Sequence, residues 1–333
     1  MAQYLITLLG TDQHFGCEPG DTVLRAALRA GIGAPYQCGV GRCGSCGIEM
    51  LEGEADGLPA RRSARSRTHS PLLACQILPR SDCTIRFPPS PYCEPRGRPL
   101  SRPATLVSRT QLSPSLLELG FHTPSPAEFL PGQYALLNLQ GLGARAYAMS
   151  NLPNREGVWQ FVVSRQTEDL PFDPLDGRSE VELDAPFGMA YLREQVPRDL
   201  VCIGDDRGIS GLLAILSAAA RSATLGTRRL WLFHQTDAAQ ALVLARLVER
   251  DPDLGGRLQV SAGRLDDPSK SAKAWDGVRA PVVDQLGHWL RECVDPRACE
   301  FYCSGSSSMT EAVKTLLGKL RVPARQMHLD PAY

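Results

Sequence analysis

The sequence has no long hydrophobic run, and this absence sets the first limit on what the chain does. No stretch approaches the roughly 18–20 consecutive apolar residues that a membrane-spanning helix needs. The first ten residues, MAQYLITLLG, lack the basic region, the long apolar core and the small-residue cleavage site of a signal peptide. We therefore expect a strand at this end, no membrane as a partner, and a cytoplasmic location.

An excess of charge of either sign is also missing. Lysine plus arginine and aspartate plus glutamate each number 36, so the formal net charge is zero. Nucleic-acid binding depends on neutralising phosphates, so this balance argues against nucleic acid as a bulk partner. The six histidines form neither an H-x-x-x-H nor an H-E-x-x-H pair, so no mononuclear catalytic metal is indicated.

A disulfide framework is absent too. Of the eleven cysteines, four stand in one motif and the other seven follow no repeating pattern. The seven are Cys17, Cys83, Cys93, Cys202, Cys293, Cys299 and Cys303. Unpatterned cysteines without a secretion signal are typical of a reducing compartment, where thiols remain free.

The four cysteines of the motif have the order C-x4-C-x2-C followed by a distant fourth: Cys38, Cys43, Cys46 and Cys75. This is the spacing of plant-type [2Fe-2S] ligands. Three glycines lie in the same loop, Gly39, Gly41 and Gly44. Glycine takes positive φ readily and lets backbone N–H groups turn toward a negative cluster. A structural zinc site is the alternative, but zinc sites usually pair two short ligand steps and only one C-x2-C is present. The motif predicts a [2Fe-2S] cluster that transfers single electrons.

The chain is too long for one core, because domains usually hold about 100–200 residues. Residues 87–99 are dense in proline and glycine, as is typical of a linker, and a second joint is expected near 194–198. The predicted domains are therefore 1–90, 99–195 and 197–333.

The first segment combines a strand-like run from Tyr4 with helical spacing of apolar residues between Asp21 and Gly31. Asp21 is the expected helix cap and Gly31 the expected stop. With the cysteine motif, these elements resemble a plant-type ferredoxin domain, which implies a β-grasp fold. Four arginines crowd the stretch before the fourth cysteine: Arg61, Arg62, Arg65 and Arg67. They are consistent with a solvated loop or with a docking patch for an acidic electron acceptor.

The second segment has short alternating runs, as in residues 134–139 and 159–163, that predict an all-β domain. It contains Pro131-Gly-Gln-Tyr134 and, further on, Arg145-Ala-Tyr-Ala-Met-Ser-Asn151. These motifs resemble the antiparallel flavin-binding barrel of the ferredoxin–NADP reductase superfamily. The resemblance implies FAD, with FMN as the alternative.

The same resemblance assigns flavin-site residues. Arg145 would place a cation at the flavin phosphates and Tyr147 a flat ring against the cofactor, while Ser150 and Gly188 would complete the site. Ala148 would also lie at the flavin, but it stands where relatives carry Ser or Thr and so lacks their hydroxyl. Many relatives also have a glycine pair that cradles the phosphates, and the corresponding stretch 164–169 has none.

The third segment alternates apolar runs with helical stretches, which predicts βαβ units and a parallel-sheet nucleotide-binding lobe. Ligands of such sheets bind at the carboxyl ends of the strands. Residues 200–211 therefore mark the expected nucleotide loop, and Gly204 and Gly208 are the expected nucleotide-binding glycines in it. Asp205 and Asp206 replace glycines of the family, and two carboxylates facing a pyrophosphate would weaken binding.

Near the end of the chain, residues 302–309 resemble the superfamily's turn that approaches the nicotinamide. The resemblance places Gly305 and Met309 at the nucleotide and puts Ser304, a catalytic candidate, where the family has cysteine. Relatives end with an aromatic ring close to the flavin. Tyr333 is the available ring and the second catalytic candidate, and a flexible terminal residue is the alternative.

The nucleotide itself is predicted from the stretch 233–238. The 2′-phosphate of NADPH is normally held by arginine after the second strand of such a lobe, and here Asp237 would disfavour it. We therefore expect NADH rather than NADPH.

The order of the three segments resembles the reductase component of bacterial multicomponent oxygenases, such as Rieske aromatic-ring dioxygenases and soluble diiron hydroxylases of aromatic catabolism. The resemblance implies an NADH-dependent oxidoreductase that passes electrons through a flavin and the cluster to an oxygenase component or an intermediary ferredoxin. The alternative is an electron-transfer or assembly subunit with a degenerate nucleotide lobe that receives electrons from another protein. The carboxylates of Asp205 and Asp206 motivate this alternative.

Overall fold

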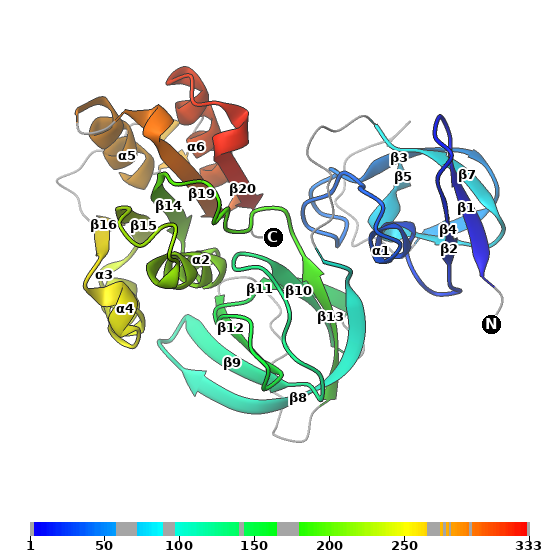
Figure 1. Cartoon of the computed structure of the whole chain (residues 1–333), viewed down its shortest axis with the longest axis horizontal. Coiled ribbons are helices and arrows are strands. Elements are labelled where there is room, and N and C mark those ends of the chain that lie inside the picture. Colours follow the sequence, from blue (N-terminus) through cyan, green and yellow to red (C-terminus); the bar gives the residue numbers. More distant parts are fainter. Residues whose placement is uncertain are drawn as a thin grey trace.

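The structure is a computed structural model (Figure 1). It describes residues 3–57, 72–88, 97–139, 143–164, 180–264, 274–275, 278–279, 281–292 and 295–331. Several features named above lie outside the described residues: the arginines at 61–67, residues 89–96 of the linker with Cys93, the stretch 165–169, Cys293 and Tyr333.

The N-terminal part forms a five-stranded mixed sheet with the order β2-β1-β7-β3-β5. Its strands are β1 (Tyr4–Leu8), β2 (His14–Cys17), β3 (Gly47–Glu52), β5 (Leu72–Leu73) and β7 (Cys83–Arg86), and a second pair joins β4 (Ala55–Gly57) to β6 (Ile77–Pro79). Strand β1 runs parallel to β7 and antiparallel to β2. Helix α1 (Val23–Arg29) and the short η1 (Ala74–Gln76) share one core with this sheet, as expected for a β-grasp fold.

Helix α1 begins differently from the prediction. Thr22 is its N-cap, because the Thr22 hydroxyl accepts a hydrogen bond from the backbone N–H of Arg25. The prediction of Asp21 as the cap is wrong, because its carboxylate instead pairs with the guanidinium groups of Arg25 and Arg29. Gly31, at a φ of 79°, follows the helix end as predicted.

The middle part is a six-stranded antiparallel barrel with the order β11-β10-β13-β8-β9-β12. Its strands are β8 (Leu100–Gln111), β9 (Leu116–His122), β10 (Tyr134–Leu139), β11 (Gly143–Ala148), β12 (Val158–Ser164) and β13 (Glu180–Phe187). Side chains of alternating residues fill its interior, among them the fully buried Phe121, Trp159 and Phe161.

The C-terminal part is a five-stranded parallel sheet with the order β16-β15-β14-β19-β20. Its strands are β14 (Asp199–Asp205), β15 (Leu230–Thr236), β16 (Leu258–Arg264), β19 (Cys299–Gly305) and β20 (Met327–Pro331), and β17 (Ala274–Trp275) pairs with β18 (Val278–Arg279). The helices are α2 (Ile209–Arg221), α3 (Ala238–Glu249), α4 (Pro252–Gly255), α5 (Pro281–Glu292) and α6 (Ser307–Lys319), with short turns η2 (Pro296–Ala298) and η3 (Ala324–Gln326). Strand β19 is buried along its whole length, which is typical of a parallel sheet covered on both faces.

The barrel lies between the other two sheets and shares a core with each of them (Figure 1). Tyr134, Leu136 and Phe187 of the barrel are buried together with ferredoxin residues. Leu116 and Val162 are buried together with helix α2 of the parallel lobe. Within the described part of the chain, no helix is both long and apolar enough to cross a membrane.

Candidate functional site

The cysteine loop is built by backbone geometry. Gly39, Gly41 and Gly44 have φ values of 65°, 80° and 76°, the left-handed region that other residues avoid. These turns direct three backbone N–H groups, those of Val40, Arg42 and Cys43, toward the sulfur of Cys38 at 3.3–3.5 Å. The loop therefore offers donors to a negatively charged sulfur before any cofactor is considered.

The four predicted ligands form two pairs. The sulfurs of Cys46 and Cys75 lie 3.2 Å apart, and Cys38 contacts Cys43. Hydrogen bonds from Cys38 and Ser45 lower the pKa of the Cys43 thiol to about 5, which favours the thiolate. Among the described residues no three candidate ligands gather around one point. Two pairs suit the two irons of a [2Fe-2S] cluster and do not suit one zinc ion, which needs all four ligands around it.

A central cavity lies beside this loop, and all three parts of the chain line it. It encloses about 860 Å³, its open mouth included. The ferredoxin part contributes Cys38, Val40 and Arg42, the barrel contributes Tyr134, Arg145, Tyr147, Ala148 and Ser164, and the parallel lobe contributes Arg207, Ser210, Ser304 and Asp330. One cofactor bound here would therefore touch the cluster loop and the nucleotide lobe at once.

Arg145 is the side chain of this cavity that most clearly calls for a ligand. Two of its guanidinium nitrogens, Nε and Nη2, are buried and have no hydrogen-bond partner among the described residues. Buried cationic nitrogens without a partner are costly, so an anionic group is expected beside them. Tyr147 lies two residues along β11, and burial raises the pKa of its hydroxyl to about 12, so it stays neutral. The pair fits a flavin: a cation for phosphate and a neutral ring for the flat part of the cofactor.

Ala148 also lines the cavity. The parallel lobe does not supply the hydroxyl that a Ser or Thr would carry at this position. Ser210 brings a hydroxyl to the same place, but that hydroxyl donates to the Ala148 carbonyl at 2.7 Å and accepts from the backbone N–H of Val162 at 3.1 Å. Ser210 therefore ties α2 to the barrel instead of serving a ligand.

The structure separates several of the other predicted residues from this cavity. Ser150 lines a different cavity, beside α2 and α4. Gly188 lies at the ferredoxin contact, where its backbone N–H donates to the Tyr36 hydroxyl at 2.9 Å. Met309 is fully buried beneath Gly305 in the core of the lobe. Of the two catalytic candidates, Ser304 lines the central cavity and Tyr333 lies outside the described residues.

The two predicted nucleotide-loop glycines have a packing role. A Cβ at Gly208 would lie 1.9 Å from the carbonyl oxygen of Ser304, and one at Gly204 would lie 2.8 Å from the same oxygen. Only glycine lets the β14–α2 loop approach the end of β19 this closely. The loop is therefore shaped for the carboxyl edge of the sheet, where parallel lobes bind their ligands.

The two carboxylates of this loop form hydrogen bonds within the lobe. Asp205 accepts hydrogen bonds from the backbone N–H groups of Arg207 at 3.0 Å and Ser306 at 2.9 Å, and so joins the two loops. Asp206 accepts from the Thr236 hydroxyl at 3.1 Å, and burial raises its pKa to about 6. Both oxygens of Asp205 and one oxygen of Asp206 are thus engaged inside the lobe, so the repulsion that these carboxylates would exert on a pyrophosphate stays a prediction.

Sequence reasoning missed Asp330, the carboxylate of this cavity. It also borders two adjoining cavities, so three spaces meet at this side chain. Burial, followed by the nearby Cys43, raises its pKa to about 7. The signal was present as a single acidic residue in the strand-like end of the chain, but only the fold brings it to the cysteine loop.

Comparison with known proteins agrees with this arrangement. Residues 6–80 match the family described as the 2Fe-2S iron-sulfur cluster binding domain. The chain is 33% identical over 330 residues to the ferredoxin–NAD(P)+ reductase CarAd of Metapseudomonas resinovorans, covering 94% of this chain and 95% of the relative. It is 28% identical to the phenol 2-monooxygenase reductase component DmpP of a Pseudomonas species, covering 99% and 94%. The solved ferredoxin reductase in carbazole 1,9a-dioxygenase superposes with a TM-score of 0.85 at 28% identity, covering 100% of this chain and 99% of that one.

Fold, cavity and similarity define a flavin- and iron–sulfur-dependent reductase. Within that class, the chain belongs to the ferredoxin–NAD(P)+ reductases that are the reductase components of oxygenase systems. The predicted fold class, the [2Fe-2S] cluster, FAD, and electron transfer from a nicotinamide nucleotide are thereby confirmed.

The cysteine pairs predict which thiols the cluster needs. Replacing Cys75 with serine should remove most of the bound iron and the cluster's visible absorbance while flavin stays bound, because the Cys46 and Cys75 pair would lose one member. Iron content and the visible spectrum of the purified protein measure this. Cys83→Ser is the matched control, since Cys83 is buried in the same core but lies outside the motif. Equal iron in both variants would contradict the assignment.

The unpaired guanidinium predicts a flavin-affinity effect. Arg145→Gln should weaken FAD binding about 10- to 100-fold, the usual worth of a hydrogen bond to a charged group. Fluorescence titration of the apoprotein with FAD measures the dissociation constant. Arg155→Gln, at an exposed turn of the same barrel, should leave the constant unchanged. If Arg145→Gln binds FAD as tightly as the unaltered chain, Arg145 does not hold the phosphates.

Asp330 predicts a pH-dependent stability. Its folded pKa of about 7 lies above the unfolded value of about 3.9, so its contribution is complete at low pH and is lost as pH rises through 7. The melting temperature of Asp330→Asn should therefore rise relative to the unaltered chain between about pH 5 and pH 8. The exposed Asp295→Asn is the control, and melting curves that stay parallel would show that Asp330 is not raised.

Proposed function

We propose that this reductase takes its electrons from NADH and delivers them to an oxygenase component, directly or through an intermediary ferredoxin. The observation that carries the proposal is the central cavity, lined together by Cys38 of the cluster loop, Arg145 of the barrel and Ser304 of the parallel lobe. The relatives named above include the reductases of a phenol monooxygenase and of a carbazole dioxygenase. A Rieske or a diiron oxygenase is accordingly the expected class of partner.

Residues from the three parts of the chain would have different roles in this cavity. FAD accepts two electrons with a hydride and releases them singly, which neither a nicotinamide nor a [2Fe-2S] cluster does alone. Arg145 would hold its phosphates, and Tyr147 would orient the flat part of the cofactor. Ser304, at the end of β19, would position the nicotinamide on the lobe side. Cys38 lines the same cavity, so the cluster loop would border the bound flavin.

Nucleotide choice rests on the end of β15. Asp237 follows this strand and caps helix α3, because its carboxylate accepts from the backbone N–H of Gln240 at 2.8 Å. The cap keeps a negative charge at the strand end where a 2′-phosphate would bind. NADH lacks that phosphate, so the charge favours NADH over NADPH.

We also propose that the chain works as three domains with the boundaries predicted from the sequence, 1–90, 99–195 and 197–333. The three separate sheets and the ferredoxin match at 6–80 support this division.

One spectroscopic experiment tests the function. NADH, and separately NADPH, is added without oxygen to the purified protein while its visible spectrum is recorded. Loss of flavin absorbance followed by loss of cluster absorbance on NADH supports the proposal. Bleaching by dithionite with no response to either nucleotide would instead favour the degenerate nucleotide lobe and a protein electron donor.

Asp237 gives a sharper test of nucleotide choice. Asp237→Ser keeps a capping oxygen but removes the charge, so kcat/KM for NADPH relative to NADH should rise about tenfold, the worth of one modest charge interaction. Steady-state rates with an artificial electron acceptor measure the ratio. Asp295→Ser, which alters the capping aspartate of η2, should leave it unchanged. A ratio unmoved by Asp237→Ser would place the discriminating group elsewhere.

A further inference from the structure

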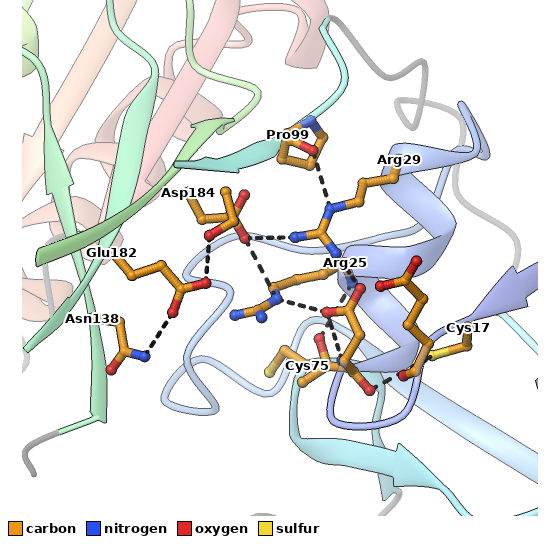
Figure 2. A network of polar contacts seen from close by, with 12 residues as sticks. Cys17, Arg25, Arg29, Cys75, Pro99, Asn138, Glu182 and Asp184 are labelled. Atoms are coloured by element: carbon orange, nitrogen blue, oxygen red, sulfur yellow. Dashed lines mark hydrogen bonds and ion pairs between the residues drawn. The ribbon is translucent and has the colours of Figure 1, made fainter. Parts of the chain in front are cut away.

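A cluster of charged side chains joins the ferredoxin part to the barrel outside the central cavity (Figure 2). Its members come from α1 and the residue before its cap on one side and from β13 on the other. We name these four residues the interdomain clasp: Asp21, Arg25, Arg29 and Asp184. The Asp184 carboxylate lies 3.2 Å from Arg29 Nη2 and 3.4 Å from Arg25 Nε. Its side chain is only 4% exposed, so this contact is made away from water.

Arg29 binds three different elements at once. Its Nη2 pairs with Asp184 on the barrel, its Nη1 pairs with Asp21, and its Nε donates to the carbonyl of Pro99 at 3.2 Å. Pro99 stands where the chain enters the barrel. A guanidinium offers these donors in one rigid plane, whereas a lysine ammonium is a single point of charge. The helix, the chain entry and β13 are therefore held in one relative position.

The energetics of the clasp favour a positioning role over simple stabilisation. Burial, with repulsion from Asp21 and Glu182, raises the pKa of Asp184 although Arg29 and Arg25 oppose the change, so the ion pairs do not fully offset the cost of placing this charge here. Buried ion pairs of this kind add little net stability, but breaking one partner leaves an uncompensated charge. What such a cluster provides is one preferred arrangement of the parts that carry it.

The clasp is mechanically close to the cluster ligands. Helix α1 packs in one core with η1, the turn that carries Cys75, and Figure 2 shows Cys75 beside the charged group. A shift of α1 on the barrel would therefore move Cys75 relative to the flavin cavity. Two neutral contacts complete the same interface: Tyr36 with Gly188, and Tyr134 with Gln37.

We propose that the interdomain clasp fixes the ferredoxin domain on the barrel in the position that permits fast electron passage from the flavin site to the cluster. Its residues are positioning residues, because none of them lines the central cavity. The inference rests on the electron path proposed above. It adds the structural element that sets the distance between the flavin site and the cluster.

The test uses Asp184→Asn, which keeps the shape of the side chain and removes its charge. The holoprotein is mixed anaerobically with NADH, and flavin and cluster absorbances are followed separately. Flavin reduction should stay within about twofold, while cluster reduction slows about tenfold or more, because the ferredoxin part is no longer held at one short distance from the flavin site. Small-angle X-ray scattering of the same protein should show a larger radius of gyration, a readout independent of activity.

Two further variants complete the test. One distinguishes an effect of domain position from an effect of charge, and the other is a control outside the interdomain clasp. Arg29→Lys keeps the charge but cannot reach three acceptors, so it should slow cluster reduction as Asp184→Asn does. Glu49→Gln is the control, since it breaks an exposed ion pair with Arg86 inside the ferredoxin sheet and should change neither readout.

The outcomes are distinct. Cluster reduction within twofold of the unaltered rate in both clasp variants overturns the inference, and so does slowing in Asp184→Asn that Arg29→Lys does not share. Slowing without any change in scattering also overturns it, because the effect would then arise from charge alone. If NADH fails to reduce the flavin of the unaltered chain, the proposed function fails instead, and chemical reduction of the flavin still tests the clasp.

Discussion

The arrangement depends on one close approach between the cysteine loop and the barrel. The Tyr134 hydroxyl, on a ring that is almost fully buried, donates to the backbone carbonyl of Gln37 at 2.5 Å. Gln37 directly precedes the first cluster cysteine. The Tyr134 ring stacks on the Phe187 ring, with their centroids 5.8 Å apart. Gly39 permits the approach, since a side chain there would meet the Tyr134 hydroxyl at 3.2 Å. The ferredoxin part thus forms one portion of the wall of the central cavity. Packing between the two parts therefore places the cluster loop beside the flavin cavity.

The parts of this structure that the sequence predicts are those set by short-range constraints. Four cysteines at fixed spacing, with glycines between them, leave few ways to fold a loop that brings their sulfurs together. Alternating apolar residues in the middle segment and apolar runs between helical stretches in the last segment follow directly from a barrel and a covered parallel sheet. Arg145 and Tyr147 are found because they belong to one short motif that resembles the superfamily's flavin motif, and alternate residues of one strand lie on the same face.

The parts that the sequence could not predict are set by contacts between segments far apart in the chain. Asp330 becomes a cavity residue only because β20 pairs with β19 at the sheet edge that meets the cysteine loop. Ser150 belongs to the same motif as Arg145, yet it lies beyond the end of β11 and lines another cavity. Asp21 looked like a cap from its position alone, but its carboxylate pairs with Arg29, and Arg29 also pairs with Asp184 of the barrel. Local sequence patterns therefore predict the cofactors, and tertiary contacts determine which side chains line the cavity.

The unpaired guanidinium of Arg145 has a consequence for the life of the polypeptide before it carries electrons. A chain that folds ahead of its cofactor buries two guanidinium nitrogens for which the described residues offer no partner, and a ligand that binds only the native state adds to its stability by mass action. Cofactor supply is thereby coupled to the amount of folded protein. In a cell short of flavin, the cofactor-free reductase would be the form most exposed to proteolysis. The flavin site therefore also determines which molecules of this protein are degraded.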